Sequence, residues 1–221
     1  MARINLERLT FDPKYHAYWW DGKQYIPSVT QILDDSGHIS KFSKSESHAN
    51  RGTEIHEMVH LEIKRLMDGR SVRGQSKIRL NQLKSIYPIE FQQFTEFHTE
   101  LDIEFMETEV MVHGSIGLLE YIPGPYIPDY AGTADIFGVF RKTGDLLAGD
   151  VKSGMSPPPH AKLQLAAYAL ARHPMDYASV KRGALTLHAN KKKYKWKEYE
   201  KEEDFQEWIR QVKRYKRNNP Q

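Results

Sequence analysis

Hydrophobic positions recur at helical spacing in several parts of the chain. From about Thr53 apolar side chains return every fourth residue, and Asp68-Gly69 supplies a stop signal, so a helix is predicted between them. A short helix is predicted after Ser28, because Ser28 and Gln31 have the spacing of a capping box. Pro88 should kink or divide a longer helical stretch. Further helices are predicted over 78–101 and 160–172 and at the C-terminal end.

Short apolar runs bounded by turn residues predict the strands. An aromatic-rich stretch broken by Asp21-Gly22 predicts a hairpin. Alternation between Phe105 and His113 predicts a strand with Val110 and Val112 on one face and Glu109 on the other. Other strands are predicted over 132–140, 146–152, 183–188 and 194–199, and the proline-containing segment 114–130 is expected to be a loop or an irregular hairpin. Because predicted helices and strands follow one another along the chain, the sequence indicates a single α/β domain.

Two of these strands carry candidate chemistry. The first begins with an acid, Asp135, and the second ends with Asp150-Val151-Lys152. Because side chains alternate along a strand, Asp150 and Lys152 share a face, and pairing of the strands brings Asp135 close to Asp150. Two adjacent carboxylates need a compensating charge, and a divalent cation is the usual one. The pattern is typical of a metal-dependent phosphodiesterase.

Composition narrows the class of protein. The 221 residues carry a formal net charge of +3. The segment 181–217 contains 13 Lys and Arg but only 6 Asp and Glu. This basic C-terminal part suits a phosphate-rich partner. The lack of cysteine excludes disulfides, thiolate zinc sites and iron–sulfur clusters. Short apolar runs and a polar N-terminal segment predict no membrane span. We therefore expect a soluble protein of a bacterial or phage-infected cytoplasm, or of an organellar matrix.

Five short motifs follow one another along the chain. They are Arg51-Gly52-Thr53-x-x-His56, Glu109, Gly132-x-x-Asp135, Asp150-x-Lys152 and Gln164-x-x-x-Tyr168. In this order they resemble the RecB-like branch of the PD-(D/E)XK nuclease superfamily, over roughly residues 26–170. The resemblance implies an α/β fold with a restriction-endonuclease-like core, in which a central mixed β-sheet is flanked by helices.

We expect one nuclease domain over residues 1–221. Its N-terminal hairpin and helices occupy 1–101, its catalytic core 102–190, and its basic C-terminal strand and helix 191–221. The resemblance implies a metal-dependent deoxyribonuclease of the phage or mitochondrial single-strand exonuclease type. Such an enzyme would act in DNA recombination, repair, replication or phage DNA processing.

The resemblance also implies a metal site. His56, Asp135 and Asp150 are expected to hold Mg²⁺ or Mn²⁺, since a neutral imidazole and carboxylates are suitable ligands. The backbone carbonyl of Val151 is expected to complete the metal shell. Glu109 is a further acidic candidate for the catalytic residues.

Three further residues are expected to support the reaction. Lys152 would orient the attacking water or stabilise the pentavalent phosphate. A nearby cation should depress its pKa toward the neutral amine, which makes it a candidate general base. Gln164 and Tyr168 lie one helical turn apart, hence on one face. The resemblance assigns them to positioning active-site groups and DNA.

The expected partner is DNA, either single-stranded or at double-stranded ends. Candidate contacts are Arg51, Ser28, Thr30 and the basic turn Lys191, Lys192 and Lys193. Tyr18, Trp19 and Trp20 are candidates for stacking on bases. A homo-oligomer, or a helicase or recombination partner, would be compatible with such an activity.

The chain departs from the family pattern in one respect. The residue before Asp135 is Ala134 rather than proline, whereas a literal Pro128-Asp129 lies six residues upstream. We prefer Asp135 because it opens an apolar strand, and keep Asp129 as a minor candidate.

Two other functions stay open at this point. His56-Glu57-x-x-His60 matches the zinc metalloprotease signature, with Glu57 as base and with Glu90 or Glu96 as the third ligand. That reading leaves Asp150-x-Lys152 without a role. A non-catalytic nucleic-acid-binding module with a nuclease-like fold is the other alternative.

Overall fold

The computed structural model describes residues 8–15, 17–39, 46–68, 73–119 and 128–220. Its centre is a five-stranded sheet in the order β4-β5-β6-β7-β8. The strands are β4 (Ile103–Gly114), β5 (Tyr130–Phe140), β6 (Leu146–Lys152), β7 (Lys181–Thr186) and β8 (Lys195–Glu198). β6 and β7 run parallel, and the other neighbours in this sheet are antiparallel. The sheet is therefore mixed.

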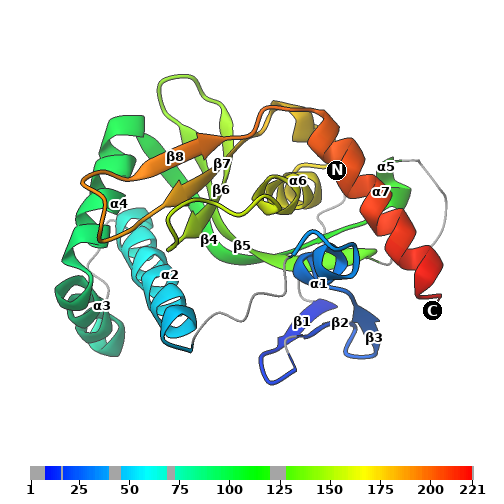
Figure 1. Cartoon of the computed structure of the whole chain (residues 1–221), viewed down its shortest axis with the longest axis horizontal. Helices are drawn as coiled ribbons and strands as arrows, with labels where there is room; N and C mark the ends of the chain where they lie inside the picture. The colour runs from blue at the N-terminus through cyan, green and yellow to red at the C-terminus, as the bar shows by residue number, and fades with distance from the viewer. Residues whose placement is uncertain (1–7, 16, 40–45, 69–72, 120–127, 221) are drawn as a thin grey trace.

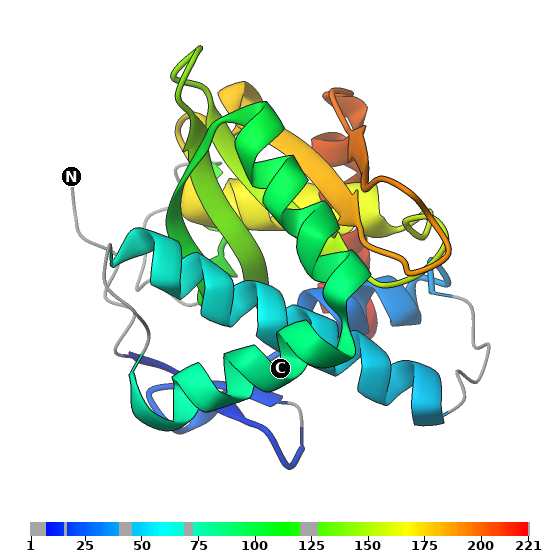
Figure 2. The same cartoon turned by 90° about the vertical axis from the view of Figure 1, so that its left-hand side faces the viewer.

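Helices cover both faces of this sheet (Figure 1), and the second view shows α3 on the outside (Figure 2). They are α1 (Val29–Asp35), α2 (Glu46–Met67), α3 (Gly74–Ile86), α4 (Pro88–Leu101), α6 (Ala161–Arg172) and α7 (Glu203–Asn218). None of the helices in the described ranges is long and apolar enough to cross a membrane. The predicted α/β class with a mixed central sheet between helices is confirmed.

Alternation along β6 explains the two layers. Ala148 packs with α1, α6 and α7 in one core, while Leu147 and Val151 pack with α2 and α4 in the other. Asp150 and Lys152 follow the parity of Ala148, so their side chains lie on the α6 side of the sheet.

A second sheet contains β1 (Leu9–Asp12), β2 (Ala17–Trp20) and β3 (Gln24–Ile26). Its β2–β3 turn uses Asp21 and Gly22, both at positive φ, 53° and 66°. The predicted turn at Asp21-Gly22 is confirmed, but the connection is one residue longer than a two-residue hairpin, because Trp20 pairs with Gln24. In Figure 1 this sheet lies beside α1.

Several boundaries differ from the sequence-based expectation. α2 begins at Glu46, so Arg51 and Gly52 lie within the helix rather than in a loop. Pro88 stands at the start of α4 and divides the long helical stretch, as its missing N–H allows in a first turn. The segment predicted as a loop contains the short helix α5 (Ile116–Leu119), and its residues 120–127 lie outside the described ranges. A 3₁₀ turn, η2, spans Tyr177–Ser179.

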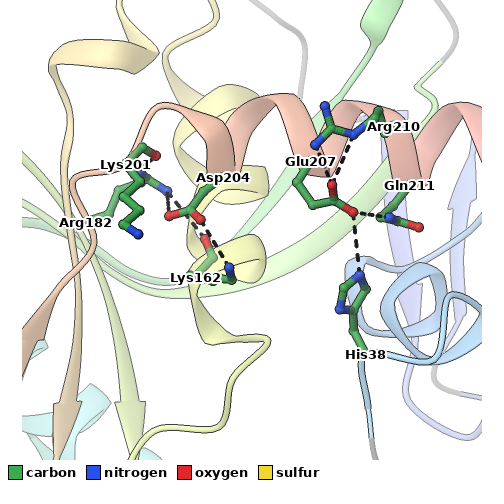
Figure 3. Close-up of polar contacts among 8 residues, drawn as sticks. All are labelled: His38, Lys162, Arg182, Lys201, Asp204, Glu207, Arg210 and Gln211. Atoms are coloured by element: carbon green, nitrogen blue, oxygen red, sulfur yellow. Dashed lines mark hydrogen bonds and ion pairs between the residues drawn. The ribbon is translucent and has the colours of Figure 1, made fainter.

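Buried charges anchor α7 to the rest of the fold (Figure 3). The Asp204 carboxylate lies 3.5 Å from Arg182 Nη1 and 3.6 Å from Lys162 Nζ. Arg182 also donates to the Lys201 carbonyl at 2.8 Å. Further along the helix, Glu207 faces His38 at 3.8 Å. These contacts tie α7 to β7, α6 and the segment after α1.

Candidate metal-binding active site

The paired ends of β5 and β6 bring the predicted acids together. The last register pair between these strands is Ile136 with Gly149, so Asp135 and Asp150 stand next to each other at the open end of the pair. Asp135 Oδ2 accepts the Val151 N–H at 2.6 Å, which fixes the carboxylate at this end. The hairpin arrangement predicted for these acids is confirmed.

Glu109 reaches the same place through an irregularity in β4. Its neighbours Thr108 and Val110 pair with Ile136 and Ala134, so Glu109 stands opposite Asp135. Glu109 has a φ of 49°, which a side chain rarely adopts. Thr108 contacts His60 of α2, whereas Val110 packs into the core on the α6 side, so the strand changes face at Glu109. Val110 and Val112 pack into the same core, as predicted, whereas the positive φ at Glu109 departs from the regular strand that the alternation assumed.

His56 of α2 completes a compact cluster. Its Nδ1 lies 3.4 Å from Asp135 Oδ2 and 3.9 Å from Glu109 Oε1. One ligand atom from each of these three residues lies within 4.8 Å of the others. Two carboxylates and an imidazole at this spacing form a donor set that suits a divalent cation.

Asp150 lies at the edge of this cluster as a further acidic donor. It is 1% exposed, and its Oδ2 is ion-paired with Lys152 Nζ at 2.6 Å. A buried carboxylate beside three candidate ligands fits a metal site. The residues present therefore match the predicted group.

The charges of the cluster shift one another's pKa values. Burial alone would lower the pKa of His56, but the Asp135 carboxylate outweighs it and raises the pKa to about 9. Burial and the charge of Asp135 raise the pKa of Glu109 to about 7. For Asp135 itself, burial is outweighed by His56, and the pKa falls. Binding a cation would therefore displace protons from His56 and Glu109.

The carboxylates around Lys152 raise its pKa, and the depression expected beside a bound cation stays a prediction. Burial lowers its pKa, but the Asp150 and Asp135 carboxylates outweigh burial and raise it. Burial and the charge of Asp135 raise the pKa of Asp150 to about 6, even though Lys152 opposes this. With the carboxylates alone around it, Lys152 is a cation and not a neutral base.

A chain of hydrogen bonds connects Lys152 to α6. Lys152 Nζ donates to Gln164 Oε1 at 3.4 Å, and Gln164 Nε2 donates to the Tyr168 hydroxyl at 3.0 Å. Burial raises the pKa of Tyr168 well above its usual value. A Cβ on Gly132 would lie 2.8 Å from Tyr168 Cε1, so the glycine leaves room for the ring. Gln164 thus contacts Lys152 and Tyr168 contacts Gln164, while their predicted role in positioning active-site groups and DNA stays a prediction.

Val151 contributes through its backbone. Its side chain is buried in the core on the α2 side, while its N–H points to Asp135. The N–H and C=O of one strand residue point to the same side, so the Val151 carbonyl also faces Asp135. This direction agrees with the predicted backbone ligand.

The residues predicted to contact DNA have different surroundings. Ser28 is 7% exposed and caps α1 by accepting the Gln31 N–H at 3.0 Å, a structural role that competes with its predicted phosphate contact, which stays a prediction. Thr30 is exposed on α1. Arg51 binds Glu90 at 2.5 Å and the Ser153 carbonyl at 2.7 Å, so its guanidinium already has partners within the protein, and its predicted phosphate contact stays a prediction. Lys191, Lys192 and Lys193 are exposed on the turn between β7 and β8.

The aromatic residues of β2 are mostly unavailable for base stacking. Tyr18 is buried and its hydroxyl lies 2.9 Å from Thr133 Oγ1. Trp20 is buried with its ring edge-on to His113. Trp19 keeps partial exposure. Stacking by Tyr18 or Trp20 is therefore excluded by packing.

The alternative motifs have structural roles. Asp129 Oδ2 accepts the Ile116 N–H at 2.6 Å at the start of α5, and Asp129 also pairs with Lys216. Glu57 pairs with Arg79 at 2.7 Å. His60 Nδ1 lies 3.2 Å from Thr108 Oγ1 and is not part of the cluster formed by His56 among the described residues.

The other acids named for the protease do not supply a third ligand beside His60. Glu90 is committed to Arg51, and Gln92 donates to Glu96 at 2.9 Å. Sequence reasoning missed Gln93, a fully buried amide beside Glu90 on α4. Polar residues at the i and i+3 positions of a buried helical stripe were the available signal.

No protein-family model matches the chain, and no curated protein matches its sequence. Among solved structures it is similar to the protein SSO0001, at 14% identity and a TM-score of 0.36, over 83% of this chain and 81% of that one. It is also similar to a protein of Eubacterium rectale named "putative exonuclease", at 10% identity and a TM-score of 0.40, over 85% and 71% of the two chains. Structural similarity this weak does not indicate an activity.

Proposed function

We propose that this chain is a metal-dependent deoxyribonuclease that hydrolyses phosphodiester bonds. The observation that carries the proposal is the cluster of His56, Glu109 and Asp135, with ligand atoms within 4.8 Å, beside the buried Asp150–Lys152 pair. A cation site next to a fixed ammonium suits a reaction in which negative charge grows on a phosphate.

In this proposal the residues of the cluster and its neighbours have different roles. His56, Glu109 and Asp135 would hold the ion, and Asp150 and the Val151 carbonyl would be further ligands. A bound Mg²⁺ or Mn²⁺ supplies Lewis-acid activation of phosphate and water. Lys152, oriented by Gln164, stabilises the charge on the phosphate, and Tyr168 holds Gln164 in place.

The finer assignment rests on the order of the sequence motifs. We place the chain in the RecB-like branch of the PD-(D/E)XK nucleases, as an exonuclease of DNA recombination, repair, replication or phage DNA processing. The mixed sheet and the junction of its two acids support this placement. The exposed Lys191–Lys193 turn supports DNA as the partner.

The test uses labelled linear DNA, single- and double-stranded, with Mg²⁺, Mn²⁺, Zn²⁺ or EDTA. We expect cleavage with Mg²⁺ or Mn²⁺, none with EDTA, and a loss of at least about a hundredfold in Asp150→Ala and Lys152→Ala. His60→Ala is the matched control for His56→Ala, since both histidines lie on α2. Cleavage by Asp150→Ala at the wild-type rate would overturn the proposal.

The same preparation tests the two alternatives. Zinc-dependent cleavage of casein that is lost in His60→Ala would identify a protease. Tight, salt-sensitive DNA binding without cleavage under any metal would identify a binding module.

A further inference from the structure

Helix α4 presents two polar side chains to the interior of the protein. Glu90 and Gln93 are 2% and 1% exposed and lie one turn apart, next to the buried rings of Phe94 and Phe97. Burying a carboxylate and an amide is unfavourable unless both are fully partnered. Their partners therefore indicate what this face of α4 does.

Gln93 binds the chain just after β7. Its Nε2 donates to the carbonyls of His188 and Lys191, at 3.2 and 2.7 Å, and its Oε1 accepts the His188 N–H at 2.9 Å. One side chain thus satisfies three backbone groups of the segment that leads into the Lys191–Lys193 turn.

Glu90 acts on the chain just after β6 through Arg51. Arg51 binds Glu90 at 2.5 Å and donates to the Ser153 carbonyl at 2.7 Å. The neighbouring Gly52 lies close to Ser153, since a Cβ there would be 3.3 Å from Ser153 Oγ. Ser153 directly follows Lys152, so the Arg51–Glu90 pair fixes the residue next to the candidate catalytic lysine.

The two bound segments leave the sheet side by side. Lys152 pairs with Thr186 at the end of the parallel β6–β7 ladder, and the Leu187 N–H donates to the Lys152 carbonyl at 2.9 Å. Ser153 and His188 are thus held just beyond the ends of adjacent strands, both by side chains that α4 supports.

We propose that Glu90, acting through Arg51, and Gln93 are positioning residues that hold Lys152 and the Lys191–Lys193 turn at a fixed separation. The turn then binds the phosphates of a nucleic-acid strand at a set distance from the metal cluster. This substrate role of the turn rests on the proposed nuclease function. The contacts by which Arg51, Glu90 and Gln93 hold the two segments, which we call the clamp, do not rest on it.

Limited trypsin digestion tests the clamp without any activity. The turn offers three lysines to trypsin, and we expect Gln93→Met to be cut there about tenfold faster than wild type, as the loss of its hydrogen bonds favours local opening. Gln92→Met is the matched control, because Gln92 is exposed on the same helix and binds Glu96. Equal cleavage of Gln93→Met and wild type, at equal Tm, would overturn the proposal.

Kinetics separate the two arms of the clamp. On an oligonucleotide we expect Gln93→Met to raise KM about tenfold with kcat unchanged, and on bis(p-nitrophenyl) phosphate, which does not reach the turn, to change neither. Arg51→Met should lower kcat on both substrates, with partial rescue in Arg51→Lys, while Mn²⁺ affinity stays unchanged. A lower kcat for Gln93→Met on both substrates would overturn the assignment of the turn.

The two proposals fail separately. If wild type cleaves neither substrate, the nuclease function is wrong, and the trypsin result still decides whether α4 holds the turn.

Discussion

Glu109 combines an unfavourable backbone conformation with a place in the metal cluster. A φ of 49° is costly for a residue with a Cβ, about 1 kcal/mol or more. Burial and the facing Asp135 carboxylate also raise the Glu109 pKa to about 7. Both effects oppose folding, so this residue is one that stability alone would not select.

Replacing Glu109 with glycine should therefore stabilise the fold and weaken metal binding. We expect Glu109→Gly to raise the free energy of unfolding by about 1 kcal/mol and to lower Mn²⁺ affinity at least about tenfold. Urea unfolding and calorimetry measure the two quantities. Glu109→Ala is the control, since it loses the ligand but keeps the strain; wild-type Mn²⁺ affinity in Glu109→Gly would remove Glu109 from the site.

His113 gives the stability a dependence on pH. It is 2% exposed, and burial lowers its pKa to about 4, below the value of about 6.5 in an unfolded chain. The folded state therefore favours the neutral ring. This contribution is complete above pH 6.5 and is lost as the pH falls from there towards 4.

We expect the free energy of unfolding to be lower at pH 5 than at pH 7.5, with up to ~2 kcal/mol of the difference due to His113. Urea unfolding of wild type and of His113→Gln at both pH values isolates it, because other groups titrate in both proteins. The same pH dependence in the two proteins would show that His113 contributes nothing.

At the scale of elements, buried charge fixes α7 against the sheet. Asp204 is 5% exposed and Arg182 2% exposed at the side chain, and burial lowers the pKa of Arg182. A buried ion pair is sensitive to the loss of one partner, because the other charge then stays in the interior uncompensated.

Asp204→Ala should destabilise the protein by about 3 kcal/mol. The double variant Asp204→Leu with Arg182→Met should lose less stability than Asp204→Ala, since it leaves no uncompensated charge. Glu207→Ala, on the same helix but partly exposed, should cost under about 1 kcal/mol. Chemical unfolding compares all three; equal effects of Asp204→Ala and Glu207→Ala would contradict the anchoring role.

At the scale of the molecule, the candidate ligands come from three elements. His56 lies on α2, Glu109 on β4 and Asp135 on β5, and only the folded chain brings them within 4.8 Å. A cation that binds this set binds the folded state alone and so stabilises it.

Mn²⁺ at a hundred times its dissociation constant should add ~2.7 kcal/mol to the free energy of unfolding. The comparison is urea unfolding with Mn²⁺ and with EDTA. His56→Ala should lose this gain and His60→Ala should keep it. A gain of equal size in His56→Ala would place the ion elsewhere.

Local patterns in the sequence predict most of the elements and several site residues. The hairpin turn, the division at Pro88 and the junction of Asp135 with Asp150 follow from nearby residues, because turns, prolines and strand pairing act over short distances. The pairing of Gln164 with Tyr168 follows from helical spacing.

Long-range packing decided the rest. Three features depend on partners far away in the chain: the positive φ at Glu109, the commitment of Arg51 to Glu90 and Ser153, and the burial of Tyr18. A charged or aromatic residue looks the same in sequence whether its partner is a phosphate, a base or the protein itself. The sequence alone determined which groups can carry the chemistry, and tertiary contacts decided which of them face the site.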